Sequence, residues 1–211
     1  HGTSLLGIVT REPYGVVENH FYHAHPRALK GTWGLPAAYA PVSSKATLER
    51  ELMGVALTRR LGVPFLVTEW DYVSPNPYAA EGALLCSAYA ALQDWDGLCR
   101  FSWDHRAAPL LSGEGVPEWF NLSCDPLRQL SERIAACLFT RGDVKPSDVT
   151  IPLLVSRRHF REKGARDEIG LLGSRLGLVA RTGNVLFTPG ERPPLPEGVR
   201  AALTVDRAGE A

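Results

Sequence analysis

Short apolar runs alternate with segments of helical periodicity through the first two thirds of this chain. The clearest run, VPFLVTEW at 63–70, is apolar at nearly every position rather than at alternate ones. That pattern is typical of a parallel strand buried on both faces. Segments 4–10, 15–23 and 97–105 are also predicted to be strands, because they are rich in β-branched and aromatic residues.

Three helices are predicted between and after these strands, over 45–61, 81–93 and 126–139. Ser44 is placed as the N-cap of the first helix and Gly62 as its stop, while Asp125 and Pro126 open the third. The third helix carries one apolar stripe at helical spacing, which predicts a face buried in the core: Leu127, Leu130, Ile134, Cys137 and Leu138.

The order of strands and helices predicts an α/β fold with parallel strands and crossover helices. Long loops with unusual residues follow the strands, as at the carboxyl-end face of a (β/α)8 barrel. Only about four strands can be counted before residue 140, which is half of a closed barrel. We therefore expect residues 1–147 to form a partial (β/α)8 catalytic domain. Residues 148–211 are expected to form a short β-rich C-terminal segment, read as the start of an incomplete second domain.

Charge and hydropathy narrow the range of partners. Lys plus Arg and Asp plus Glu number 23 each, so nothing favours nucleic acid or an anionic membrane. No apolar run approaches the roughly 18 residues that span a bilayer. No signal-peptide pattern is visible at the N-terminus, and the localisation stays open, with an extracellular or periplasmic site as one option. The four cysteines form no C-x-x-C pair and are predicted to be buried, reduced thiols.

Chemically reactive side chains gather at three predicted strand ends. In ENHFYHAHP, strand alternation places His20 and Tyr22 on one face and Asn19, Phe21 and His23 on the other. Glu69 and Trp70 end the second strand, and FSWDH with Trp103 and His105 ends the third. If the strands are parallel, these ends meet at one mouth.

This combination of groups suits sugar chemistry. Indole faces stack on pyranose rings, and His and Tyr donate hydrogen bonds to hydroxyls or orient a carboxylate. A positioned Glu can attack the anomeric carbon to form a covalent glycosyl-enzyme, which a second carboxyl group then resolves.

The same residues resemble the motifs of clan A retaining glycoside hydrolases, the cellulase-like family 5 and its relatives. His20-Phe21-Tyr22 is similar to the His-x-Tyr of strand six, and Thr68-Glu69-Trp70 to the nucleophile motif of strand seven. Trp103 falls where the strand-eight tryptophan lines the site of the reacting sugar. The resemblance covers roughly residues 15–146.

The resemblance implies a hydrolase that cleaves a β-linked glycoside or polysaccharide with retention, without a cofactor and with a carbohydrate as its only implied partner. Glu69 would be the nucleophile, Tyr22 its hydrogen-bond partner, and His20 a ligand of the substrate or a support for Glu69. Trp103 would stack on the sugar. The remaining candidates for sugar contacts are Trp70, Asn76 and His105.

One part of the family pattern is missing. Such enzymes take their acid/base from a Glu that follows Asn at the end of strand four. TREP resembles that motif but has Arg11 in place of Asn, and the stretch from Glu12 to His20 is too short for a crossover. Glu18 lies at the start of its own strand, where it is not expected to face the mouth. The chain is therefore interpreted as the C-terminal part of a barrel that lacks its acid/base.

Other interpretations remain open. A non-catalytic carbohydrate-binding module or pseudoenzyme would keep the aromatic residues without turnover. A metal-dependent hydrolase would use His20, His23 and His25, but strand alternation separates the first two, so no metal is expected. Asp104 and His105 are either a carboxylate–imidazole pair or ordinary loop residues. The basic stretch at 156–166 is predicted to be a solvated loop or hairpin.

Overall fold

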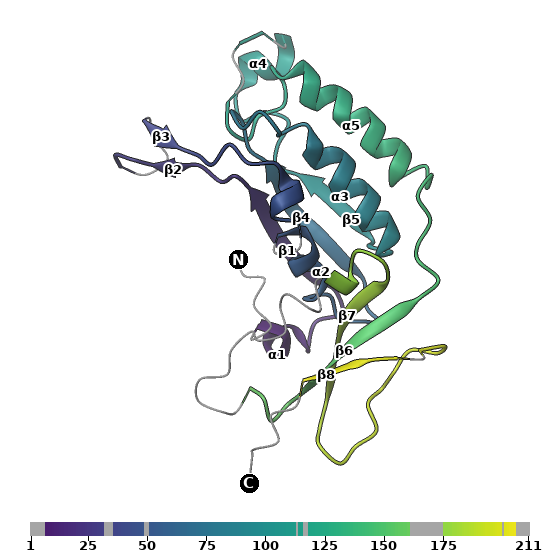
Figure 1. Ribbon diagram of the computed structural model, residues 1–211. Coiled ribbons are helices and arrows are strands. Elements are labelled where there is room, and N and C mark those ends of the chain that lie inside the picture. Colours follow the sequence, from purple (N-terminus) through teal and green to yellow (C-terminus); the bar gives the residue numbers. More distant parts are fainter. Residues whose placement is uncertain are drawn as a thin grey trace.

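The computed structural model describes residues 7–31, 36–48, 51–112, 114–115, 118–160, 175–199 and 201–205. In these residues the protein is α/β, as the alternation of strands and helices predicted (Figure 1). It contains two separate parallel sheets of three strands each, together with a short antiparallel pair, β2 (Arg27–Ala28) and β3 (Ala37–Ala38).

The first sheet has the order β1-β4-β5, with β1 at Val17–His23, β4 at Phe65–Tyr72 and β5 at Gly97–Arg100. All three strands are parallel, so the three predicted strands and their direction are confirmed, although β5 is shorter than expected. The register pairs Asn19 with Val67 and then His20 with Glu69. Thr68 is therefore an extra residue in β4, a bulge at the point where the strand reaches its reactive end.

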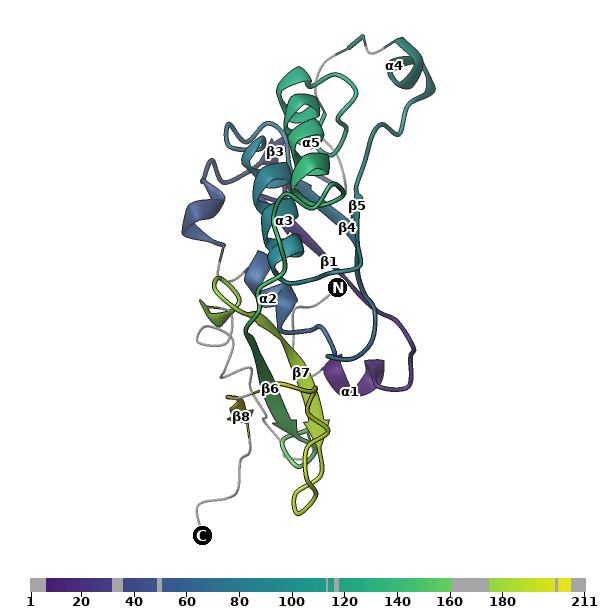
Figure 2. The same cartoon turned by 90° about the vertical axis from the view of Figure 1, so that its right-hand side faces the viewer.

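Helices α3 (Glu81–Leu92) and α5 (Pro126–Leu138) lie against one side of this sheet, with the short α2 (Leu52–Ala56) at its lower end (Figures 1 and 2). Helix α3 approaches β4 closely at Gly82, where a Cβ atom would lie 2.4 Å from the Tyr72 ring. The main core fills the space between the sheet and these helices, with Phe65, Val67, Tyr72, Cys86, Ala90 and Trp95 among its buried members.

The opposite side of the sheet is less covered. Along β1, Val17, Asn19, Phe21 and His23 are buried toward the helices, whereas Glu18, His20 and Tyr22 are partly or largely exposed. The predicted division of His20 and Tyr22 from Asn19, Phe21 and His23 is confirmed. Strand β1 thus turns Glu18, His20 and Tyr22 away from the side of the sheet that α3 and α5 cover (Figure 2).

Neither sheet closes in the described residues, so the parallel strands are confirmed and the partial (β/α)8 barrel stays a prediction. Two other predicted elements are corrected. Of the strand predicted at 4–10, the part within the described residues forms helix α1 (Ile8–Arg11). The helix predicted at 45–61 is reduced to a 3-10 turn (Ser44–Ala46) and α2. Ser43 and Ser44 bind the Glu81 carboxylate, which holds the start of this segment against α3.

Helix α5 is turned opposite to its predicted orientation. Leu127, Leu130 and Ile134 are 62%, 54% and 45% exposed, while Arg128, Ser131 and Ala135 are buried. The reason is electrostatic, because Arg128 reaches inward to the buried carboxylate of Asp71. The buried face of α5 is therefore the face that carries Arg128 to Asp71, and it packs mainly against α3.

The second sheet has the order β7-β6-β8, with β6 at Thr150–Ser156, β7 at Arg181–Phe187 and β8 at Leu203–Val205. Polar side chains connect this second sheet to the segments that surround the first sheet. The Gln93 amide donates to the carbonyls of Gly177 and Ala180, and the Asn184 amide donates to the carbonyls of Leu57 and Arg59.

The cysteines within the described residues are all free thiols. Cys86 and Cys124 are buried as predicted, Cys137 is partly exposed, and Cys99 is exposed on β5, which corrects the expectation for that residue. Within the same residues, no helix is long and apolar enough to cross a membrane.

Candidate functional site

Tyr22 and Glu69 form the centre of the candidate site, on the open side of the adjacent strands β1 and β4. The Tyr22 hydroxyl donates a hydrogen bond of 2.7 Å to Glu69 Oε2. His20 Nδ1 lies 3.2 Å from the same oxygen. Two polar groups from β1 therefore meet one carboxylate oxygen from β4. Among the described residues, none forms a hydrogen bond with the other oxygen, Oε1.

Tyr22 is held in its neutral form. Burial raises the pKa of the Tyr22 phenol, and the hydrogen bond and negative charge of Glu69 raise it further. A phenol in this environment keeps its proton at physiological pH and donates it in a hydrogen bond. The role open to Tyr22 is therefore to orient and stabilise a carboxylate rather than to remove a proton.

The other ring nitrogen of His20 is also engaged. His20 Nε2 lies 2.8 Å from Thr68 Oγ1 and 3.1 Å from Glu18 Oε2. The Thr68 hydroxyl itself donates to Glu18 Oε2 at 2.7 Å. The imidazole thus lies between two carboxylates, with the extra residue of the β4 bulge beside it.

Aromatic rings line one side of Tyr22. Its ring packs edge-on against Phe101 after β5 and Phe120 in the loop before α5, with centroid distances of 6.2 and 5.3 Å. His105 joins this wall, since its ring lies 5.0 Å from Phe101 and its Nδ1 lies 2.7 Å from Asn121 Oδ1. Sequence reasoning missed Phe120, because a single aromatic residue in a loop carries no periodic signal.

Trp103 is accessible, as a stacking platform would need to be. It is 49% exposed. Its backbone carbonyl accepts hydrogen bonds from the amides of Leu122 and Ser123, which fix the loop that follows β5. Asp104 is not paired with His105. It binds Arg106 and Ser123, and the Arg106 hydrogen bond holds the pKa of Asp104 well below its ordinary value. The two residues are therefore separate polar groups of the loop.

Two residues predicted to contact sugar lie in the interior instead. Trp70 is 2% exposed, stacks on Phe21 at a centroid distance of 6.4 Å, and carries the Arg100 guanidinium 4.3 Å above its ring. Asn76 is buried and donates to the Val42 carbonyl at 3.0 Å. Neither side chain is open to a ligand in this structure, since Trp70 packs on Phe21 and Asn76 is bound to the Val42 carbonyl.

A buried group of charges lies beside the site, around Asp71. Arg128 donates to both oxygens of Asp71 at 2.9 Å, and Arg100 lies 2.5 Å from Asp71 and from Glu132. Burial raises the pKa of Asp71 to about 7, and the two arginines oppose that rise. Arg128 also reaches the Phe120 carbonyl. These contacts join β4, β5 and α5 to the loop that packs on Tyr22.

The remaining histidines of the ENHFYHAHP segment do not form a metal site with His20. His23 is fully buried on the helix side, with Nδ1 2.6 Å from Glu51 Oε2 and Nε2 2.8 Å from the Val42 carbonyl. The His25 ring packs beside Tyr22 at 5.6 Å. Within the described part of the chain, no group of three or more His, Cys, Asp or Glu side chains is arranged to hold a metal.

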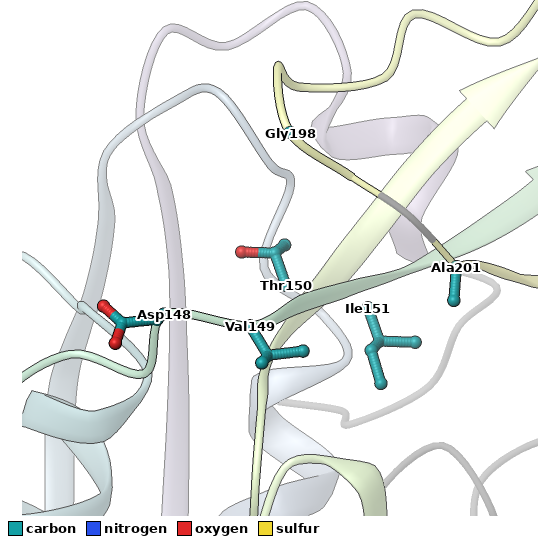
Figure 3. Close-up of a pocket in the computed structure, with 6 residues that line it drawn as sticks. All are labelled: Asp148, Val149, Thr150, Ile151, Gly198 and Ala201. Atoms are coloured by element: carbon teal, nitrogen blue, oxygen red, sulfur yellow. The ribbon is translucent and has the colours of Figure 1, made fainter.

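The structure also contains a pocket of about 380 Å³ at the start of β6 (Figure 3). None of its lining residues belongs to the cluster around Glu69: Asp148, Val149, Thr150, Ile151, Gly198 and Ala201. Its lining is mostly apolar, with one carboxylate and one hydroxyl. We place the candidate site at Glu69, because that is where several polar groups converge on one reactive atom.

Comparisons of the chain with protein-family models, with curated proteins and with solved structures give no match.

Proposed function

We propose that this chain supplies the C-terminal, nucleophile-bearing part of a (β/α)8 barrel of a retaining glycoside hydrolase. Its substrate would be a β-linked glycoside or polysaccharide. The observation that carries the proposal is the convergence of Tyr22 Oη and His20 Nδ1 on Glu69 Oε2, at 2.7 and 3.2 Å. A carboxylate held by one oxygen presents the other in a defined direction, as a nucleophile requires.

The parallel order of β1, β4 and β5 supports the barrel part of the proposal. In a barrel, the side of these strands that carries Glu18, His20 and Tyr22 would face inward, and α3 and α5 would lie on the outside. The open edges of β1 and β5 would then pair with further strands. The polar side chains on the side of the sheet that the helices leave open fit the interior of such a barrel.

The chemistry proceeds in two displacements. Glu69 Oε1 attacks the anomeric carbon, the bond to the leaving oxygen breaks, and a second carboxyl group gives that oxygen its proton. The resulting glycosyl ester on Glu69 is hydrolysed by water, whose proton returns to the second group. Tyr22 remains a neutral donor to Oε2 throughout, since its pKa is raised. Trp103, half exposed, is the proposed platform for the sugar ring.

The second carboxyl group is not identified among the described residues. Retention needs it about 5 to 5.5 Å from the nucleophile. Glu12 is bound by Arg157, whose hydrogen bond lowers the pKa of Glu12, so it is a poor proton donor. Glu18 is engaged by Thr68 and His20. We therefore propose that an upstream strand provides the acid/base, as an Asn-Glu pair at its carboxyl end.

The test is Glu69→Gln in the full-length gene product, assayed on aryl β-glycosides and a polysaccharide panel. Loss of a nucleophile should lower kcat by several orders of magnitude while the fold is retained. Glu197→Gln, which changes an exposed acid in the C-terminal segment, is the matched control and should keep full activity. Undiminished hydrolysis by Glu69→Gln would exclude the assignment.

A second candidate is carbohydrate binding without hydrolysis. It is favoured by the exposure of Trp103 together with the lack of an identified second carboxyl group among the described residues. In that case the protein would retain polysaccharides on affinity gels and release no reducing sugar. Trp103→Ala would then abolish retention, and Glu69→Gln would leave both retention and the absence of turnover unchanged.

A further inference from the structure

We propose that Glu18 and Thr68 are positioning residues for Glu69, acting through His20. The inference rests on the proposed role of Glu69 as nucleophile and extends it to two residues with no assigned role. Its basis is a continuous set of contacts from Glu18 Oε2 to Thr68 Oγ1, then to His20 Nε2, and from His20 Nδ1 to Glu69 Oε2.

The β4 bulge makes these contacts possible. The register advances from Asn19–Val67 to His20–Glu69, so both Thr68 and Glu69 lie opposite the single residue His20. In a regular strand, successive side chains point to opposite faces, and only one of the two could reach the imidazole. The bulge directs both toward the same ring, which is a known use of bulges beside reactive groups.

The hydrogen bonds from Glu18 to His20 show which nitrogen of the His20 ring carries a proton. The Thr68 hydroxyl has one hydrogen and gives it to the Glu18 carboxylate, which can only accept. Thr68 Oγ1 must then accept from His20 Nε2, 2.8 Å away, so Nε2 carries a proton. The plane of the ring is set by groups on the side away from Glu69, and Nδ1 can donate to the Glu69 carboxylate only when the ring carries both protons.

The anchored His20 ring in turn positions Glu69, the proposed nucleophile. With its Nε2 side anchored, the ring holds Nδ1 at 3.2 Å from Glu69 Oε2, the oxygen that Tyr22 also contacts. Both contacts converge on Oε2 and leave Oε1 for attack. A half-exposed strand acid such as Glu18 would have no effect on catalysis if it were merely solvated. Here it orients the side chain that orients the nucleophile.

The test uses three variants of the full-length gene product. Thr68→Val removes the hydroxyl and keeps the branched shape, Thr68→Ser keeps the hydroxyl, and Glu18→Gln removes the charge. Glu197→Gln is the distant control. The first readout is the ¹⁵N spectrum of the histidine rings, with the His20 signals assigned from a His20→Gln variant. We expect a protonated Nε2 in the parent and in Thr68→Ser, and shifted His20 signals in Thr68→Val and Glu18→Gln.

The second readout is the rate of covalent labelling by a 2-deoxy-2-fluoro-β-glycoside with a dinitrophenolate leaving group. This probe needs no acid catalysis and so reports on the nucleophile alone. Misplacement of the carboxylate in Thr68→Val should lower the maximal labelling rate about tenfold or more without changing the half-saturating concentration. Thr68→Ser and Glu197→Gln should label as fast as the parent.

The outcomes separate this inference from the proposed function. Unchanged His20 signals in Thr68→Val would overturn the proposed positioning role of Thr68. Labelling of Thr68→Val at the parent rate would overturn it as well. If the parent protein itself forms no adduct with the probe, the proposed function fails. The histidine-ring spectra then test the inference by themselves. A spectral change confined to His20 in Thr68→Val would support the positioning of His20 by Thr68.

Discussion

The Tyr22 hydroxyl lies 2.7 Å from Glu69 Oε2, across two adjacent parallel strands. The ladder pairs Glu69 with His20 and Tyr22 with Asp71, so this hydrogen bond runs diagonally along the sheet. It depends on the β4 bulge, which turns Glu69 to the open side while Trp70 enters the core. The phenol reaches Glu69 Oε2 along this diagonal, and the His20 imidazole reaches the same oxygen from the paired position.

Removal of the Tyr22 hydroxyl should slow the chemical step. In Tyr22→Phe, Glu69 Oε2 loses its neutral donor, and kcat on aryl β-glycosides should fall about 10- to 100-fold with KM little changed. The ring contacts with Phe101 and Phe120 persist, so the unfolding midpoint should remain close to that of the parent. Tyr14→Phe, at an exposed tyrosine, is the control and should leave both quantities unchanged.

Removal of Arg128 should destabilise the fold strongly. Arg128→Met removes one of the two arginines that contact the buried Asp71 carboxylate and leaves Arg100, at an expected cost of about 3–5 kcal/mol. Arg133→Met, at an exposed position of the same helix, should change the free energy of unfolding by less than about 0.5 kcal/mol. Urea denaturation of both variants measures the difference. Similar values for the two would show that the buried pair does not anchor α5.

The exposed face of α5 should tolerate polar substitution. Leu130→Gln is expected to change the free energy of unfolding by about 0.5 kcal/mol or less, because this side chain is already in water. Ala135→Gln introduces a large polar group on the buried face and should destabilise by about 1–3 kcal/mol. If Leu130→Gln destabilised the protein more than Ala135→Gln, the apolar face of α5 would be the buried one, as the sequence pattern predicts.

The His23–Glu51 pair should make stability depend on pH. Burial opposes the charge on His23, but the hydrogen bonds with Glu51 and the Val42 carbonyl prevail and raise its pKa. A histidine whose pKa is raised on folding contributes stability that is complete below its unfolded value of about 6.5. That contribution is lost as the pH rises through the folded pKa.

The pH effect is measured as the difference in Tm between the parent and Glu51→Gln, at intervals from pH 5 to pH 9. The difference should be largest at the acid end, where His23 is charged, and should shrink as the pH rises through the folded pKa of His23. Glu197→Gln should show no such trend. A difference that stays constant with pH would mean that the pair is held without a charge on His23.

Much of the framework could be predicted from the sequence. The continuous apolar run at 63–70 identified a buried parallel strand, and alternation along ENHFYHAHP placed His20 and Tyr22 together. Both predictions depend on local periodicity, which a single sequence displays directly. The convergence of Glu69 with these two residues followed from the expectation that parallel strands end at one edge.

The misassigned residues depend on tertiary contacts that periodicity does not contain. Trp70 was a candidate for sugar contacts, but it turns to the core and packs under Arg100. The α5 stripe was predicted to be buried because it is apolar, yet Arg128 turns the helix toward Asp71. The role of Thr68 depends on a bulge, and no residue pattern in VPFLVTEW reveals where the extra residue lies.

Whether Glu69 is the nucleophile is tested most directly by locating the covalent adduct that a 2-deoxy-2-fluoro-β-glycoside forms with the full-length gene product. Intact-mass analysis followed by peptide mapping should find one sugar per chain, attached to the peptide that contains Glu69. The Glu69→Gln variant should remain unmodified under the same conditions. An adduct on a different carboxylate, with Glu69 unmodified, would show that Glu69 is not the nucleophile.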